Sequence, residues 1–300
     1  VKEHPGSLIE LGRELFRRLA LGYMSCFEHA EDSGGKDFAK NSLPRLIVRL
    51  LRAHGQWLKW SQYRYGPLDP VIWQNLGVAN LAAVEARFDT RACAAYGEGR
   101  AETSPEHEYL KALLFQASAV DHLRPQEVEI TERLIPHLLA GVRLVREVQP
   151  GATHWIDPSR PMAPMRIARL PEPSSSLRFL NMSKALATLN ELVATVEKGE
   201  LPDGLDLGTA YPPKVVLPVL QHIATYWAPR PPTRAFPRHP VRTGARSVVG
   251  FSQVHGQLSG RETAAVSWQI TDVSRGGFCV RVRLRDDGTL RLGALLAIQP

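Results

Sequence analysis

Cysteine is scarce in this 300-residue sequence, which contains only three, at positions 26, 93 and 279. The number is odd, and no pair has the Cys-x-x-Cys spacing that is typical of zinc and thiol-redox sites. A disulfide framework and a cysteine-based zinc site are therefore excluded as the basis of the fold. The composition is typical of a protein from a reducing compartment.

Long hydrophobic runs are also missing. No stretch approaches the ~20 apolar residues that a helix needs to cross a bilayer. No basic-then-apolar leader opens the chain, which starts at Val1. We therefore expect no membrane span and a cytoplasmic location.

The local motifs of common enzymes are absent as well. The sequence has no Gly-x-Ser-x-Gly, no Walker loop, no Gly-x-Gly-x-x-Gly and, among its 10 histidines, no His-Glu-x-x-His. We expect a protein that is not an enzyme and that holds no metal or cofactor. A catalytic site assembled from distant residues stays open, because it would leave no such pattern.

Acidic residues are absent from one long segment. Residues 207–261 contain no Asp or Glu but seven cations: Lys214, Arg230, Arg234, Arg238, Arg242, Arg246 and Arg261. The other 30 basic residues (37 − 7) equal the 30 acidic ones, so the net charge of +7 belongs to this segment. Such a localised field attracts an anion to one place, and a solvated basic linker is the alternative interpretation.

The fold class that the sequence predicts is α+β with several domains. Residues 1–150 are expected to form an all-α helical bundle, because apolar residues recur at helical spacing between breaks such as Ser33-Gly34-Gly35. The expected helices cover residues 6–32, 43–65, 70–96, 105–123 and 125–148, the last one kinked at Pro136.

Residues 151–228 are expected to form a connecting α/β subdomain. Frequent prolines rule out a long helix in its first part, where residues 165–170 and 177–180 are short enough for strands. Helices are predicted over 183–198 and 212–227. Three prolines, at positions 229, 231 and 232, then predict a stiff, extended hinge.

Residues 229–300 have the pattern of a small antiparallel β-barrel. Strands are predicted over 247–254, 265–271, 278–284 and 294–298, with a hairpin turn at 285–288. So few strands predict either that the sequence is a piece of a longer protein, with an incomplete barrel, or that the barrel is atypical.

Two short motifs in this last region carry the functional prediction. Arg234-Ala-Phe-Pro-Arg238 places two guanidinium groups four residues apart on a non-helical segment, and Asp272-Val-Ser274-Arg-Gly-Gly277 is a polar turn between two strands. Arginine pairs with phosphate, stacks on base faces and matches the O6/N7 edge of guanine. A phosphorylated purine is the ligand that suits this combination.

The order Arg-x-x-x-Arg, then Asp-x-Ser-x-x-Gly, on a small β-barrel resembles the PilZ domain family, over about residues 230–300. The resemblance implies binding of the bacterial second messenger cyclic di-GMP. It implies that Arg234 and Arg238 clamp guanine edges and phosphates, and that Asp272 accepts from guanine or fixes an arginine. Ser274 would hydrogen-bond the ligand, and Gly277 would allow close approach of the backbone. Arg230 precedes Arg234 by four residues, so the register is ambiguous, and Arg230 is a further candidate for a second nucleotide.

These observations together predict a non-enzymatic cyclic di-GMP receptor that reorients its barrel against the helical domain and signals to a protein effector. One alternative is a single-stranded nucleic-acid binder, since small barrels with basic arms serve that purpose. Few aromatic residues in the β region, namely Phe251, Trp268 and Phe278, make nucleic acid an unlikely partner. The other alternative is a helical interaction scaffold with a degenerate barrel.

Overall fold

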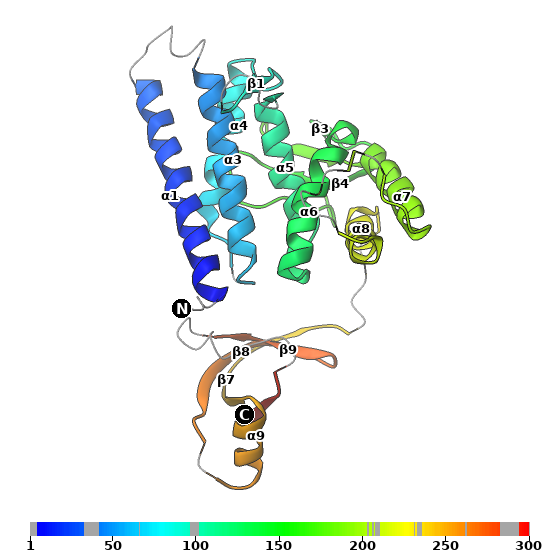
Figure 1. The fold of residues 1–300 in the computed structure, drawn as a ribbon. Helices are drawn as coiled ribbons and strands as arrows, with labels where there is room; N and C mark the ends of the chain where they lie inside the picture. The colour runs from blue at the N-terminus through cyan, green and yellow to red at the C-terminus, as the bar shows by residue number, and fades with distance from the viewer. Residues whose placement is uncertain are drawn as a thin grey trace. The chain divides into compact units, whose positions relative to one another are not determined.

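A computed structural model describes residues 5–32, 42–65, 67–96, 102–202, 204–205, 207, 211–230, 232, 236–261, 263–282 and 294–299. The chain divides into two compact units, Val1–Pro231 and Pro232–Pro300 (Figure 1). Each unit is described by itself below. The predicted boundaries at residues 150 and 228 remain predictions.

The first unit begins with helices that pack side by side, as Figure 1 shows for α1, α3 and α5. The predicted helical N-terminal region is confirmed, with α1 (Pro5–Asp32), α3 (Leu43–Gln62), α4 (Pro70–Glu85), α5 (Pro105–Ala117) and α6 (Pro125–Leu138). Local capping sets two of the starts: Asp69 Oδ1 accepts from Val71 N at 3.0 Å, and Ser104 Oγ accepts from His107 N at 3.2 Å. Each cap is followed by a proline, which is favoured at the first helical position.

Four of these helices end earlier than the sequence predicts: α3 ends at Gln62 and α5 at Ala117, and α4 and α6 are shorter by ten residues or more. The helix expected to reach residue 96 stops at Glu85, because Arg87 adopts a left-handed conformation (φ 56°). Short strands β1 (Cys93–Ala94) and β2 (Glu102–Thr103) then pair. The helix expected to reach residue 148 ends at Leu138, two residues after Pro136, and is followed by the 3₁₀ turn η2 (Leu139–Gly141). A proline inside a helix removes one backbone donor and crowds the preceding turn.

The rest of the first unit is a small sheet with two more helices. The antiparallel sheet has the order β3-β6-β4-β5, with β3 (Arg143–Val145), β4 (Ala152–Ile156), β5 (Met165–Arg166) and β6 (Arg178–Asn181). Helices α7 (Ser183–Glu197) and α8 (Pro213–Trp227) follow. The buried side chains of these elements, Trp227 among them, belong to one cluster with those of α3 and α5. Trp227 Nε1 also donates to Ser118 Oγ, just after α5, at 3.1 Å.

The second unit is an open, antiparallel four-stranded sheet with one helix. Its order is β10-β7-β8-β9, with β7 (His239–Val249), β8 (Val266–Ser274), β9 (Gly277–Arg281) and β10 (Leu296–Gln299). The prediction of a barrel is wrong for the described residues, because β9 and β10 form the two outer edges of the sheet. Small apolar residues and one tryptophan make its core: Ala245, Val248, Val254, Trp268 and Ile270.

The predicted strand over residues 247–254 is wrong beyond Val249. Gly250 has a φ of 91°, which glycine adopts without a steric penalty, and the chain turns there into helix α9 (Phe251–Leu258). Val254 and Gly256 are the buried positions of α9. The predicted hairpin turn at 285–288 lies outside the described residues.

A buried histidine links α3 to α4. The His54 Nδ1–H group donates to the Leu50 carbonyl at 2.9 Å, and Nε2 lies 3.0 Å from the Asn75 amide nitrogen, whose hydrogen it accepts. Burial lowers the pKa of His54 to about 4, and burial together with the charge of Arg166 lowers that of His154 to about 4. Both side chains are therefore neutral in the folded protein at neutral pH.

We expect His54 to make stability depend on pH. Its folded pKa lies below the unfolded value, so the unfolded chain binds an extra proton below about pH 6.5 and stability falls toward pH 4. Between pH 7 and pH 4.5 the free energy of unfolding by urea should fall about 2 kcal/mol less in His54→Gln than in the wild type. His154→Gln should behave similarly. Equal losses in all three proteins would contradict the assignment.

Candidate ligand-binding site

The Asp-x-Ser-x-x-Gly motif forms the tight hairpin turn between β8 and β9. Ser274 pairs with Gly277 across the turn, which leaves Arg275 and Gly276 at its tip. The Ser274 hydroxyl donates to the Gly277 carbonyl at 3.1 Å and accepts from Gly276 N at 3.3 Å. Gly277 has a φ of 150°, which disfavours any residue with a Cβ. The serine and the glycine of the motif therefore shape the turn.

The arm that leads into β7 lies against this hairpin. Pro240, at the start of β7, is in register with Asp272 of β8. One step before the strand, Arg238 Nη1 lies 3.0 Å from Asp272 Oδ1 and 3.2 Å from Oδ2. The Arg238 side chain is 43% exposed, so solvent screening limits what this pair contributes to stability. Its main consequence is to orient the guanidinium group of the arm.

An aromatic side chain on the arm completes the arrangement. Phe236 is 39% exposed, and the guanidinium carbon of Arg275 lies 5.7 Å from the centroid of its ring. A Cβ at Gly276 would come within 3.0 Å of that ring, so the glycine permits the close approach of the arm to the turn. Sequence analysis did not identify Phe236 and Arg275. Both could have been identified from their positions in the motifs, because Phe236 lies between the two arginines of one motif and Arg275 lies inside the other.

The six predicted site residues fall into three groups. Arg238 and Asp272 are in direct contact, and Ser274 and Gly277 belong to the hairpin that carries Asp272. Arg230 is exposed and follows α8 in the first unit. Arg234 lies outside the described residues. Contact of any of these residues with a ligand remains a prediction.

The site combines features that suit an aromatic anion. Arg238 uses one terminal nitrogen on Asp272, and a guanidinium has five N–H donors in a planar fork. Further donors therefore remain for a phosphate or a base edge. The exposed ring of Phe236 and the guanidinium plane of Arg275 are surfaces on which a base can stack.

Two other features, a membrane-spanning helix and a metal site, are absent from the part of the chain that the structure describes. No described helix is both long and apolar enough to span a membrane. In the same part of the chain, no three side chains of the types His, Cys, Asp and Glu gather closely enough to hold a metal ion.

Comparison with known proteins gives one match, and it covers the other end of the chain. Residues 2–148 match a family model described as the N-terminal domain of the cyclic-di-GMP receptor FimW. No curated protein and no solved structure matches the chain. The matched region contains helices α1, α3, α4, α5 and α6 and none of the residues of the hairpin site.

The backbone at Gly277 leads to a prediction about stability. Gly277→Ala should destabilise the protein by about 1–2 kcal/mol, because alanine resists a positive φ. Gly244→Ala in β7 is the matched control, since a Cβ there meets nothing within 4 Å. It should be neutral or slightly stabilising. The test is urea unfolding followed by circular dichroism, and equal effects of the two substitutions would contradict the assignment.

Proposed function

We propose that the protein is a non-enzymatic receptor for cyclic di-GMP, which binds at the arm and hairpin of the second unit. The contact between Arg238 and Asp272 carries the proposal, because it joins two motifs that are 34 residues apart in the sequence. The match of residues 2–148 to the N-terminal domain of a cyclic-di-GMP receptor is independent support, because it shares no residue with these motifs.

In the proposed complex, Arg238 donates to the O6/N7 edge of a guanine or to a phosphate, and Asp272 holds the guanidinium in place. Phe236 and Arg275 stack on a base, and Arg234 supplies a second guanidinium. Gly276 and Gly277 have no side chains, so the backbone of the turn stays open to the ligand. Two bidentate arginine contacts with stacking correspond to about −8 kcal/mol, or micromolar affinity.

A PilZ-type site is the finer form of this proposal. The arm and the turn have the order and the contact that such a site requires. The sheet of the described residues is open, so the proposal rests on the arm and the turn and not on a closed barrel.

Signalling would follow from the position of the arm. Arg238 lies a few residues after Pro231 and Pro232, where the two units meet in the sequence. A ligand that binds Arg238 and the hairpin together favours one conformation of this junction, which is a population shift driven by differential contacts. The first unit would pass the change on to a protein effector.

Titration calorimetry with cyclic di-GMP tests the proposal. The wild type should bind with micromolar affinity, and Arg238→Ala should bind about 10- to 100-fold more weakly, since each bidentate contact to guanine contributes about 1–3 kcal/mol. Arg261→Ala, which removes another exposed cation of the same unit, is the control for net charge. It should bind as the wild type does.

Three outcomes would argue against this function. The first is no heat at tens of micromolar nucleotide, and the second is equal affinity of the Arg238→Ala and Arg261→Ala variants. The third is displacement of cyclic di-GMP by oligo-dT at equal concentration, which would favour a single-stranded nucleic-acid binder.

A further inference from the structure

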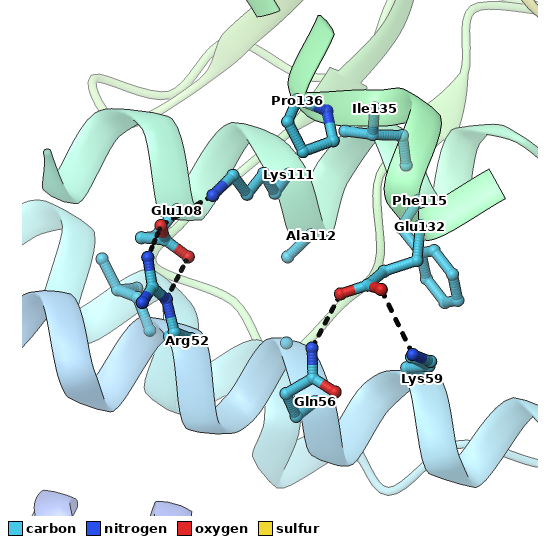
Figure 2. A pocket seen from close by; sticks show the side chains of 12 residues that line it. Arg52, Gln56, Lys59, Glu108, Lys111, Ala112, Phe115, Glu132, Ile135 and Pro136 are labelled. Carbon is cyan, nitrogen blue, oxygen red and sulfur yellow. Dashed lines mark hydrogen bonds and ion pairs between the residues drawn. The ribbon is translucent and has the colours of Figure 1, made fainter. Parts of the chain in front are cut away.

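A cleft opens between α3, α5 and α6 in the first unit (Figure 2). Its volume is about 270 Å³. The middle of the cleft is apolar, and charged side chains stand at both ends. The apolar lining comes from all three helices: Leu51 from α3, Ala112 and Phe115 from α5, and Ile135 and Pro136 from α6.

A glycine on α3 keeps this cleft open. Gly55 lies in the interior of the helix, where glycine destabilises relative to alanine. Packing accounts for two other helical glycines: a Cβ at Gly12 would overlap the Trp60 ring, and one at Gly77 would overlap the Pro158 carbonyl. A Cβ at Gly55 would meet nothing within 4 Å, and Gly55 lines the cleft. Neighbouring packing therefore does not require glycine here, and a large side chain at this position would occupy the cleft.

One end of the cleft presents cations to an incoming ligand. Glu108 accepts from Arg52 Nη2, Lys111 Nζ and Thr103 Oγ1, each at 2.8 Å, and its side chain is 3% exposed. Burial opposes its ionisation, but Arg52 and Lys111 hold its pKa below the usual range. The side chains of Arg52 and Lys111 are each 30% exposed. The carboxylate is thus covered, and the groups within reach of a ligand are donors with a net positive charge.

The opposite end is closer to neutral. Glu132 accepts from Gln56 at 2.8 Å and from Lys59 at 3.2 Å. Lys59 is buried and also pairs with Glu129, which in turn pairs with Arg133. Positive and negative charges balance in this group, but the Lys59 side chain is 8% exposed and that of Glu132 is 33% exposed. The exposed cations that line the cleft are therefore those at the other end, Arg52 and Lys111.

We propose that the α3–α5–α6 cleft binds a short acidic segment of a partner protein. An apolar side chain of the segment fills the space above Ala112, and a neighbouring carboxylate pairs with Arg52 and Lys111. Charge complementarity selects the carboxylate, and the apolar lining selects the side chain beside it. This site lies in the helical unit, and the inference does not depend on the nucleotide site proposed above.

The test uses full-length protein and fluorescein-labelled synthetic hexapeptides in fluorescence anisotropy. One peptide alternates Glu with Leu, a second replaces Leu by Ser, and a third replaces Glu by Lys. We expect binding of the Glu–Leu peptide only. Gly55→Leu should weaken it at least tenfold, because leucine is a good helix former whose side chain would fill the cleft.

Two further variants control this experiment. Gly22→Leu changes a glycine of α1 whose Cβ would also meet nothing within 4 Å, and it should bind the peptide as the wild type does. Lys111→Met keeps the length of the side chain and should weaken binding several-fold. Arg52 is left unchanged, because its removal would leave the buried Glu108 poorly paired. Circular dichroism at equal temperature confirms that each variant is folded.

Several results would overturn the inference. The first is that the wild type does not bind the Glu–Leu peptide at about 1 mM. The second is that the wild type binds the Lys–Leu peptide as tightly as the Glu–Leu peptide. The third is that the Gly55→Leu variant binds the Glu–Leu peptide as tightly as the wild type does. A doubled mass in solution that Gly55→Leu abolishes would assign the cleft to a second copy of the chain. If the Gly55→Leu variant lost affinity for cyclic di-GMP, the cleft would be assigned to the nucleotide. If only the Arg238→Ala variant lost that affinity, the result would concern the proposed receptor site and not the cleft.

Discussion

The ion pair between Arg238 and Asp272 is the contact on which the candidate site depends. It joins a segment before the first strand of the second unit to a hairpin 34 residues later, and the pairing of Pro240 with Asp272 fixes the position of both. In solvent such a pair contributes little to stability. Its importance is geometric, because it orients a planar cation beside Phe236 and the glycine turn. Without that orientation, the arm would be one more basic segment.

The two units contribute different chemistry. The second unit offers exposed arginine donors, an aromatic ring and a turn with two glycines, which are properties of an anion site. The first unit offers a cleft whose carboxylates are already paired and whose end at Arg52 and Lys111 is cationic. The family match covers residues 2–148 of the first unit, and the arginine and Asp-x-Ser-x-x-Gly motifs lie in the second. A receptor needs both a place for its ligand and a place for its effector, and the two proposed sites belong to different units of this chain.

Burial decides which charged groups are available for binding. Glu108 is ionised but covered, and His54 is neutral because burial disfavours its charged form. Both act within the fold. In contrast, the side chain of Arg238 is 43% exposed, and those of Arg52 and Lys111 are each 30% exposed. Among the 37 basic residues of the sequence, these three combine exposure and a fixed carboxylate partner with a position in the hairpin site or in the cleft.

Local rules were enough to predict where the helices of the first unit begin and the residue types of the arm and turn, because each depends on neighbours within a few residues. The helix starting at Phe251, the early end of α6 and the open order of the sheet were not predicted. They follow from a glycine with a positive φ, a proline two residues before the end of the helix and the pairing of strands far apart in the chain. Tertiary structure alone brought Arg238 to Asp272, laid Phe236 against the turn and left Gly55 facing a cleft. Such contacts depend on how segments that are distant in the sequence pack together, and this packing cannot be predicted from periodicity and composition.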